Sequence, residues 1–378
     1  FSGTSTTLFT VTGTDANGCQ NTATSNVTVQ GNAPINAGND TTICSGQSVT
    51  LTVTGGATYT WDQGLGAGNN FVVSPALTTT YTVNGTDANG CTGADQIVVT
   101  VNPVPTVNPV ANQTVCANSS VAGINFSGSV PGTTYDWVNS NATIGLAAAG
   151  TGNIAGFTGV NAGTSAITAT VTVTPTLNGC TGTPINFTIT INPIPVLNPI
   201  TDQTLCNGVM TAPVNFSSAT SGTTFAWTNN NTAIGLGSNA SGNIGAFSAT
   251  NNGTSPISGT ITVTPTANGC QGTPESFDII VNPSPVVAPI TDQTLCNGVA
   301  TAAVNFSSAT PGATFSWTNN TTSIGLGASG NGNIASFNAT NTGTTQVTAT
   351  ILVSASANGC LGPQESFDII VNPTPTVN

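Results

Sequence analysis

The stretch ITVTPTANGCQGTPESFDIIVNPSP, residues 261–285, decides the fold. Apolar and polar residues alternate in both of its halves, so that Phe277 and Ile279 face one side of an extended strand. Asn268–Gly269 stands between the halves, and Asn-Gly accepts the positive φ angles of a tight turn. The stretch therefore predicts an antiparallel hairpin of two β-strands.

This pattern recurs because the chain is a row of repeats. ESFDIIVNP occurs at 275–283 and again at 365–373, and TDANGC occurs at 14–19 and again at 86–91. Self-similarity at a fixed period indicates a repeat architecture. Short strands at such spacing predict an all-β chain of tandem immunoglobulin-like β-sandwiches. The expected bounds are 1–30 for the C-terminal part of a truncated repeat, 31–103 for a short repeat, 104–193, 194–283 and 284–373 for long repeats, and 374–378 for the start of a further one.

The composition excludes many functions. The 378 residues include no Lys, Arg or His and twelve acidic residues, which gives a formal charge of −12. Nucleic-acid binding through phosphate neutralisation and attachment to anionic lipid both need cationic side chains. Histidine-dependent nucleophiles and lysine Schiff bases are also excluded. No apolar run is long enough to cross a bilayer, so we expect no membrane insertion. Because these catalytic residue types are missing, we also expect no enzyme activity.

One tryptophan occupies the same place in each repeat, two residues after another aromatic residue. A row of aromatic faces could stack on sugars, but a sandwich also needs a large inward residue on a central strand. We interpret these residues as core aromatics: Trp61, Trp137, Trp227 and Trp317.

Eight of the nine cysteines fall into pairs by position, which predicts one disulfide in each repeat. The expected pairs are Cys44 with Cys91, Cys116 with Cys180, Cys206 with Cys270, and Cys296 with Cys360, while Cys19 is left unpaired. Each bridge is expected at one end of its sandwich, tying an early strand to the late hairpin. Metal binding is the alternative, but the sequence has no CxxC pair and no histidine.

The acidic residues are few and scattered. Glu275 with Asp278 could form a glycosidase pair, but residues three apart on a strand point to opposite faces. Asp202 and Asp292 follow the segments between repeats, where a calcium ion could rigidify a joint. A plain turn or surface aspartate is the alternative interpretation, and no other cofactor is expected.

The segments between long repeats have the form Asn-Pro-x-Pro. Proline fixes φ and favours extended geometry, which predicts short, stiff joints and an extended rod. Tension along such a rod would load many backbone hydrogen bonds together. Lateral association of rods is expected at threonine-rich strand edges.

The runs TTYTVNGTDANGC and ITVTPTANGCQGTPESFDIIVNPSP, with the FxWTNN and GNIxxF segments, resemble the PKD-like and immunoglobulin-like repeats of giant surface proteins in Bacteroidota. The resemblance implies a non-catalytic part of an adhesin exported by the type IX system, of the SprB type that serves gliding motility. Its contacts with surface polysaccharide or other cells would then be made by domains outside this sequence. The alternative that the resemblance leaves open is a spacer or carbohydrate-binding array of a secreted hydrolase.

The disulfides and the resemblance together predict an extracellular location at a bacterial cell surface, since disulfides persist in oxidising compartments.

Overall fold

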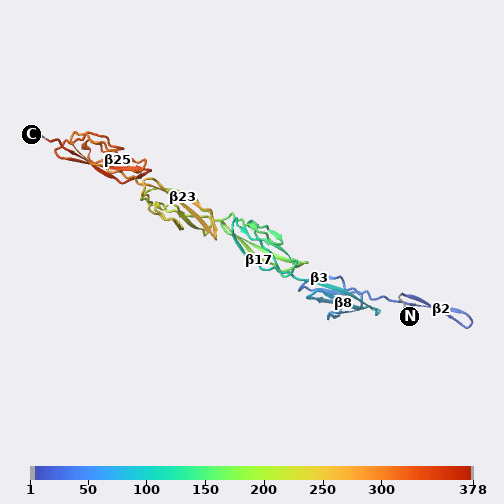
Figure 1. Cartoon of the computed structure of the whole chain (residues 1–378). Coiled ribbons are helices and arrows are strands. Elements are labelled where there is room, and N and C mark those ends of the chain that lie inside the picture. The colour runs from blue at the N-terminus through green and yellow to red at the C-terminus, as the bar shows by residue number, and fades with distance from the viewer. Residues whose placement is uncertain (1–4, 376–378) are drawn as a thin grey trace. The chain divides into compact units, whose positions relative to one another are not determined.

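A computed structural model describes residues 5–375 of the chain. By its internal contacts the chain divides into two compact units. The first unit holds the chain up to Thr114, Ser119–Gly159 and Thr168–Thr190, and the second holds Val115–Asn118, Val160–Ile167 and the chain from Ile191. The described residues form β-strands and three 3₁₀ helices of one turn each, which confirms the all-β class (Figure 1).

The first strands form a hairpin. Strands β1 (Thr7–Thr14) and β2 (Gln20–Val27) pair antiparallel, from Thr7 opposite Val27 to Thr14 opposite Gln20. Almost all of the side chains on these two strands are exposed.

The short repeat, residues 31–103, contains two sheets. The larger sheet has the order β3-β9-β8-β5-β6, and the smaller one pairs β4 with β7. The strand bounds are β3 Thr41–Cys44, β4 Val49–Thr52, β5 Thr58–Trp61, β6 Gly66–Ala67, β7 Asn70–Val73, β8 Thr79–Thr86 and β9 Thr92–Asn102.

The long repeats, residues 104–193, 194–283 and 284–373, repeat the order of the larger sheet. Their sheets have the orders β10-β17-β15-β12-β13, β18-β23-β21-β19-β20 and β24-β29-β27-β25-β26. In residues 104–193 the strands are β10 Gln113–Cys116, β11 Ser120–Val121, β12 Thr134–Asn139, β13 Ala149–Thr151, β14 Phe157–Thr158, β15 Ile167–Leu177, β16 Cys180–Thr181 and β17 Ile185–Asn192, with the helix η1 at Ala142–Ile144.

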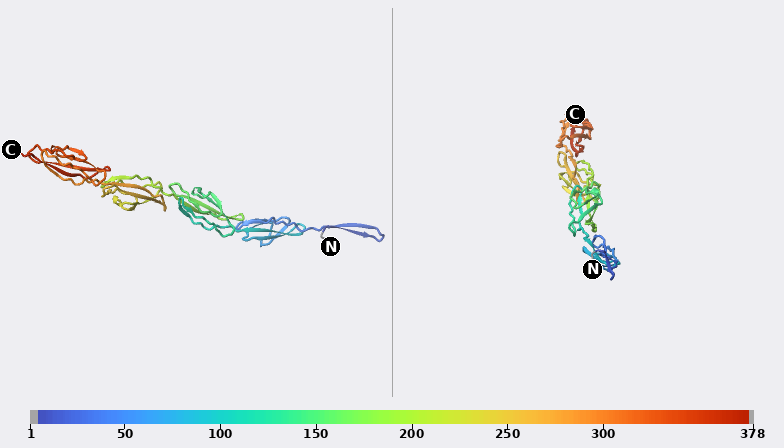
Figure 2. Two further views of the ribbon diagram at one scale, coloured as in Figure 1. Left: turned by 45° about the horizontal axis from the view of Figure 1, so that its top comes forward. Right: turned by 90° about the vertical axis from the view of Figure 1, so that its right-hand side faces the viewer.

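The last two repeats carry the same elements except strands equivalent to β11 and β14, and Figure 2 shows them from two further directions. Residues 194–283 contain β18 Gln203–Cys206, β19 Thr224–Asn229, η2 Thr232–Ile234, β20 Asn239–Ser241, β21 Ile257–Ala267, β22 Cys270–Gln271 and β23 Glu275–Asn282. Residues 284–373 contain β24 Gln293–Cys296, β25 Thr314–Asn319, η3 Thr322–Ile324, β26 Ser329–Asn331, β27 Val347–Ala357, β28 Cys360–Leu361 and β29 Glu365–Asn372.

The predicted hairpin is present. Strand β21 pairs antiparallel with β23, and the inward residues Phe277, Ile279 and Val281 are at most 3 % exposed. The turn at Asn268 and Gly269 has φ angles of 50° and 78°, the left-handed region that Asn and Gly tolerate.

In residues 31–103, 194–283 and 284–373 the strand that ends in the first cysteine runs parallel to the last strand. Strand β18 pairs with β23 so that Cys206 stands opposite Asn282, and β24 pairs with β29 so that Cys296 stands opposite Asn372. The parallel direction brings this cysteine to the end of the sheet where the chain leaves the repeat. We call that end the exit end, and the opposite end, where the Asn-Gly turn lies, the turn end.

Candidate functional site

The three disulfide bonds of the structure join neighbouring repeats. In the first unit Cys44 bonds Cys180. In the second unit Cys116 bonds Cys270 and Cys206 bonds Cys360. The first cysteine of each of these repeats therefore bonds the second cysteine of the next repeat, and the predicted pairing within each repeat is wrong.

Strand direction is the physical reason for this correction. In residues 194–283 the first cysteine, Cys206, lies at the exit end beside Asn282, and the second, Cys270, lies just before β23 begins at the turn end. The length of β23 separates the two cysteines by about 25 Å, given a rise of about 3.3 Å per residue. Bonded cysteines need Cα atoms about 4.4–6.8 Å apart. The Cα atoms of Cys206 and Cys360 are 5.5 Å apart, within that range.

Three cysteines are free thiols in the structure. Cys19 and Cys296 are exposed, and Cys91 is half-buried. Cys91 and Cys296 were expected to pair with Cys44 and Cys360, so these two pairings are also wrong. Each of those two partners is instead bonded to a neighbouring repeat.

A side-chain hydrogen bond accompanies each disulfide. The amide nitrogen Nδ2 of Asn282, which stands beside Cys206, donates to the backbone carbonyl of Asn358, 3.1 Å away in the next Asn-Gly turn. Asn192 Nδ2 donates to the carbonyl of Asn268 over 3.2 Å, and Asn102 Nδ2 to that of Asn178 over 3.0 Å. We call each set of one disulfide and one such hydrogen bond a joint.

The exit end of each repeat is held in place by its own backbone. The backbone N–H of the residue after the first cysteine donates to the carbonyl of the joint asparagine, as from Asn207 to Asn282 over 2.9 Å. The same bond runs from Ser45 to Asn102 over 2.9 Å. Each repeat therefore presents its cysteine and its asparagine side by side to the next Asn-Gly turn.

Sequence reasoning missed these asparagines. Each directly precedes the first proline of an Asn-Pro-x-Pro segment, a position shared by Asn102, Asn192, Asn282 and Asn372. That recurrence was a usable signal, but it was assigned to the stiffness of the linker and not to a contact with the next repeat.

The joints constrain the unfolded chain strongly. The bonded cysteines are 136 residues apart in one disulfide and 154 apart in the other two. In the chain-entropy description, closing loops of this length stabilises the folded state by about 5 kcal/mol each. The loops overlap in sequence, because Cys116 lies between Cys44 and Cys180, and Cys206 lies between Cys116 and Cys270.

The four tryptophans lie in the cores of the repeats and are 3–8 % exposed: Trp61, Trp137, Trp227 and Trp317. Their indole rings are packed inside the sandwiches and are covered, so they offer no flat face for stacking on a sugar. Trp61 Nε1 donates to the carbonyl of Gly68 over 3.2 Å, whereas the indole nitrogens of the other three have no hydrogen-bond partner among the described residues.

The aspartates that follow the linkers support the parallel strand pair. Asp202 Oδ1 accepts a hydrogen bond from the backbone N–H of Asp278 over 2.7 Å, and Asp292 does the same for Asp368. In residues 104–193 the neutral Asn112 serves in this position, accepting from Thr188 over 2.8 Å. The position thus ties the strands together whether or not its side chain is charged. No group of three or more acidic, cysteine or histidine side chains in the described part of the chain could hold a metal ion.

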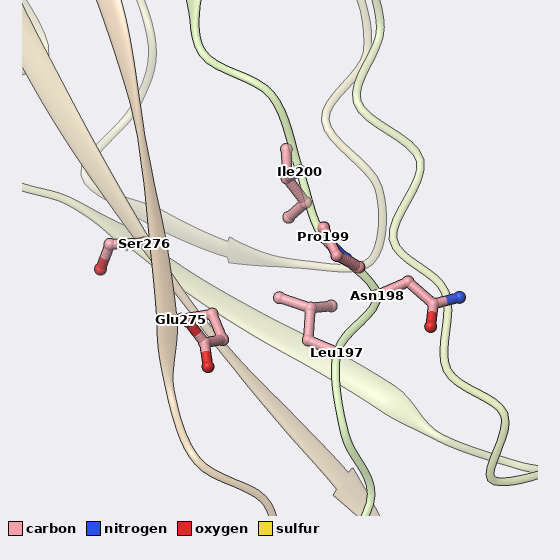
Figure 3. A pocket seen from close by; sticks show the side chains of 6 residues that line it. All are labelled: Leu197, Asn198, Pro199, Ile200, Glu275 and Ser276. Carbon is pink, nitrogen blue, oxygen red and sulfur yellow. The ribbon is translucent and has the colours of Figure 1, made fainter.

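A cavity of about 260 Å³ opens beside strand β23 in the second unit. It is lined by Leu197, Asn198, Pro199, Ile200, Glu275 and Ser276. Figure 3 shows Glu275 and Ser276 on opposite sides of the strand, as the alternation of a strand requires. Asp278 faces the other side of the strand and does not line the cavity. The cavity therefore presents the single carboxylate of Glu275, whereas glycoside hydrolysis uses two.

Comparison with known proteins supports the sandwich assignment. Residues 113–195 match the family described as PKD-like domain. No curated protein sequence matches the chain. Among the described residues no helix is both long and apolar enough to cross a membrane.

Several solved structures of tandem domains are similar to the chain. A variant of titin domains I67–I69 is 12 % identical, with a TM-score of 0.45, and the match covers 72 % of this chain and 99 % of that one. The N-terminal eight immunoglobulin domains of Down Syndrome Cell Adhesion Molecule are 12 % identical, with a TM-score of 0.40, covering 97 % of this chain and 53 % of that one. Protocadherin gammaB7 EC3-6 is 10 % identical, with a TM-score of 0.36 and coverage of 88 % and 98 %.

The strand pairing and the PKD-like match together define the class of the chain. It is an array of immunoglobulin-like β-sandwich repeats, and residues 113–195 within it match the PKD-like domain. The three disulfide bonds belong to an oxidising, extracellular setting.

Proposed function

We propose that the chain is a non-catalytic, load-bearing stalk of a large secreted bacterial surface adhesin, which gives the adhesin reach and mechanical strength. The observation that carries the proposal is the joint. A disulfide between consecutive repeats gives tension a covalent route that does not depend on any repeat staying folded.

The disulfide bonds shorten the covalent path between the two ends of the array. A covalent path from residue 31 to residue 373 can pass through residues 31–44, cross to 180–206, and cross again to 360–373. This path contains roughly 55 residues and extends at most about 200 Å, whereas the uncrosslinked chain between the same positions extends to about 1,200 Å. The sandwiches lying outside the path can unfold without lengthening the stalk beyond that limit.

Single-molecule pulling between the two ends of the chain tests the proposal. With the disulfides intact, we expect the length between residues 31 and 373 to stop at about 200 Å. After reduction we expect successive unfolding steps, each releasing roughly 300 Å for a long repeat. Free extension of the oxidised protein to the length of the reduced one would refute the load-bearing role.

The finer part of the proposal concerns the parent protein. The resemblance of the repeats to those of giant Bacteroidota proteins supports an adhesin of the SprB type, exported by the type IX system and used in attachment and gliding. In this proposal other domains contact surface polysaccharide or other cells. A glycan-array screen of the chain separates this role from a carbohydrate-binding array, because tight binding of one sugar class would favour the latter.

Side-by-side association of stalks is a further part of the proposal. The exposed strand β20, Asn239–Ser241, lies at the edge of its sheet and carries no charged residue that would discourage pairing. Analytical ultracentrifugation at increasing concentration should then detect reversible association, and a purely monomeric protein would remove this part.

A further inference from the structure

The Asn-Gly turns that close the joints leave one backbone group unused. Asparagine and glycine form the whole turn between two paired strands at Asn178–Gly179, Asn268–Gly269 and Asn358–Gly359. Among the described residues the glycine N–H of these three turns has no acceptor. The asparagine side chains are exposed, and within the same part of the chain their amides make no hydrogen bond. We call Asn178, Asn268 and Asn358 the turn asparagines.

The chain contains seven further Asn-Gly pairs, and in these the glycine N–H is occupied. Gly90 donates to the carbonyl of Asp87 over 3.1 Å, and Gly208 donates to that of Ala249 over 2.7 Å. Gly85 lies inside β8, between two paired strands. The other donors and acceptors are Gly18 with Asp15, Gly253 with Asn251 Oδ1, Gly298 with Ala339, and Gly332 with Phe315.

A free glycine nitrogen beside an exposed asparagine allows a reaction within the turn. When hydroxide removes the N–H proton of Gly359, this nitrogen can attack Cγ of Asn358. An N–Cγ bond forms, the Cγ–Nδ2 bond breaks, and Nδ2 leaves as ammonia with a proton taken from water. Water then opens the five-membered imide at either carbonyl, which gives aspartate or isoaspartate. Glycine favours the attack because it has no side chain to hinder its nitrogen.

We propose that the turn asparagines are the sites at which this protein deamidates, and that the joints control the rate. The ring closes only when the turn opens enough to bring the glycine nitrogen to Cγ, which is a local opening. Asn282 Nδ2 holds the carbonyl of Asn358 over 3.1 Å, so a closed joint restrains this opening. The inference rests on the geometry of the joints and does not depend on the proposed role as a stalk.

The modification would change the joint in which it occurs. Isoaspartate carries the main chain through its Cβ and Cγ atoms, so the former backbone carbonyl of Asn358, the acceptor of Asn282, becomes a carboxylate beside the main chain. Either product also adds a negative charge to a chain that has twelve acidic residues and no Lys, Arg or His. Each joint would therefore weaken with the time that its turn has spent open.

Timed incubation of the full chain in a mildly alkaline buffer tests the assignment of the sites. The protein is then reduced, digested with pepsin in acid and analysed by mass spectrometry, and protein isoaspartyl methyltransferase labels the isoaspartate. We expect the turn asparagines to deamidate about fivefold faster than Asn89 and Asn207, the ratio that corresponds to the net strength of one hydrogen bond at the glycine N–H. Equal or faster reaction at Asn89 or Asn207 would overturn the assignment.

Asn282→Ala tests the control by the joint. This variant removes the amide that holds the carbonyl of Asn358 and keeps the backbone hydrogen bond between positions 207 and 282. We expect Asn358 to deamidate at least twofold faster in the variant. Asn268 should be unchanged in the same molecule, because its carbonyl is held by Asn192.

The control for this measurement is Asn239→Ala, at an exposed asparagine of the edge strand β20, which should leave all of these rates unchanged. An unchanged rate at Asn358 in Asn282→Ala would contradict control by the joint. An equal rise at Asn268 would contradict it as well, because the repeat as a whole would then have loosened.

Discussion

The short repeat, residues 31–103, and the long repeat, residues 194–283, make the same joint to the next repeat but fill their cores differently. Both place a cysteine beside an asparagine at the exit end, Cys44 beside Asn102 in one and Cys206 beside Asn282 in the other. In the short repeat Tyr81 stands opposite Ile97, whereas in the long repeat Ile261 stands opposite Phe277.

The long repeat adds a segment that covers its central strand. The one-turn helix η2 buries the Ile234 side chain completely. Gly259 leaves room for this side chain, because a Cβ atom at that position would lie 2.5 Å from Ile234 Cδ1. The short repeat has no such helix and carries Thr79 where the strand pairing places Gly259. The comparison teaches that the sandwich can change in size while the joint stays constant.

Replacing Ile234 by Ala should have the largest effect on the long repeat. The side chain is fully buried against β21, so we expect the free energy of unfolding of residues 194–283 to fall by about 3 kcal/mol. Hydrogen exchange read by mass spectrometry resolves each repeat separately. Val286→Ala, at a side chain that is 59 % exposed, is the control and should change little. An unchanged exchange rate in Ile234→Ala would show that the helix does not stabilise the core.

Asn229 anchors the added segment by hydrogen bonds. Its Nδ2 lies 3.0 Å from the carbonyl of Leu236 and 3.1 Å from that of Asn231. We expect Asn229→Ala to lower the stability of the repeat by about 2 kcal/mol, because buried carbonyls lose their donor. Asn229→Asp keeps the shape but removes the donor, so its thermal unfolding should shift as much. Wild-type stability in Asn229→Asp would contradict this role.

The tryptophans of the two repeats differ by one hydrogen bond, which should have a smaller effect on the free energy of unfolding. Trp61 Nε1 has the carbonyl of Gly68 as its acceptor, while Trp227 Nε1 has none among the described residues. We expect Trp61→Phe to destabilise its repeat by about 1 kcal/mol more than Trp227→Phe does. Denaturant titration followed by hydrogen exchange in each repeat measures the difference. Equal losses would mean that the Trp61 hydrogen bond contributes nothing net.

The smallest expected effect is a dependence of the stability of the short repeat on alkaline pH. Burial, with a smaller contribution from the nearby Asp62 carboxylate, raises the pKa of Tyr81 above its usual value of 10.0. The unfolded chain then loses its phenolic proton first, so stability is full below about pH 10 and falls as the pH rises toward the folded pKa. Tyr81→Phe should flatten this decline, whereas residues 194–283, with Ile261 in that place, should not respond.

The strands could be predicted from the sequence, and the joints could not. Alternation at Phe277 and Ile279 and the Asn-Gly turn determine the hairpin locally. Cysteine spacing alone allows either a bond within a repeat or one to the next repeat, since both recur with the same period. The choice depends on the parallel direction of β18 against β23, a contact between segments about 75 residues apart that carries no local signal. Asn282 was overlooked for the same reason, because its acceptor belongs to another repeat.

The overlapping loops also determine how the molecule responds to proteases. Every peptide bond between residues 44 and 360 lies inside at least one disulfide loop. A single cleavage anywhere in that span leaves both fragments covalently attached, so no piece is shed until a second cut falls within the same loops. A chain cross-linked in this way remains one molecule after a single cleavage at any point in that span.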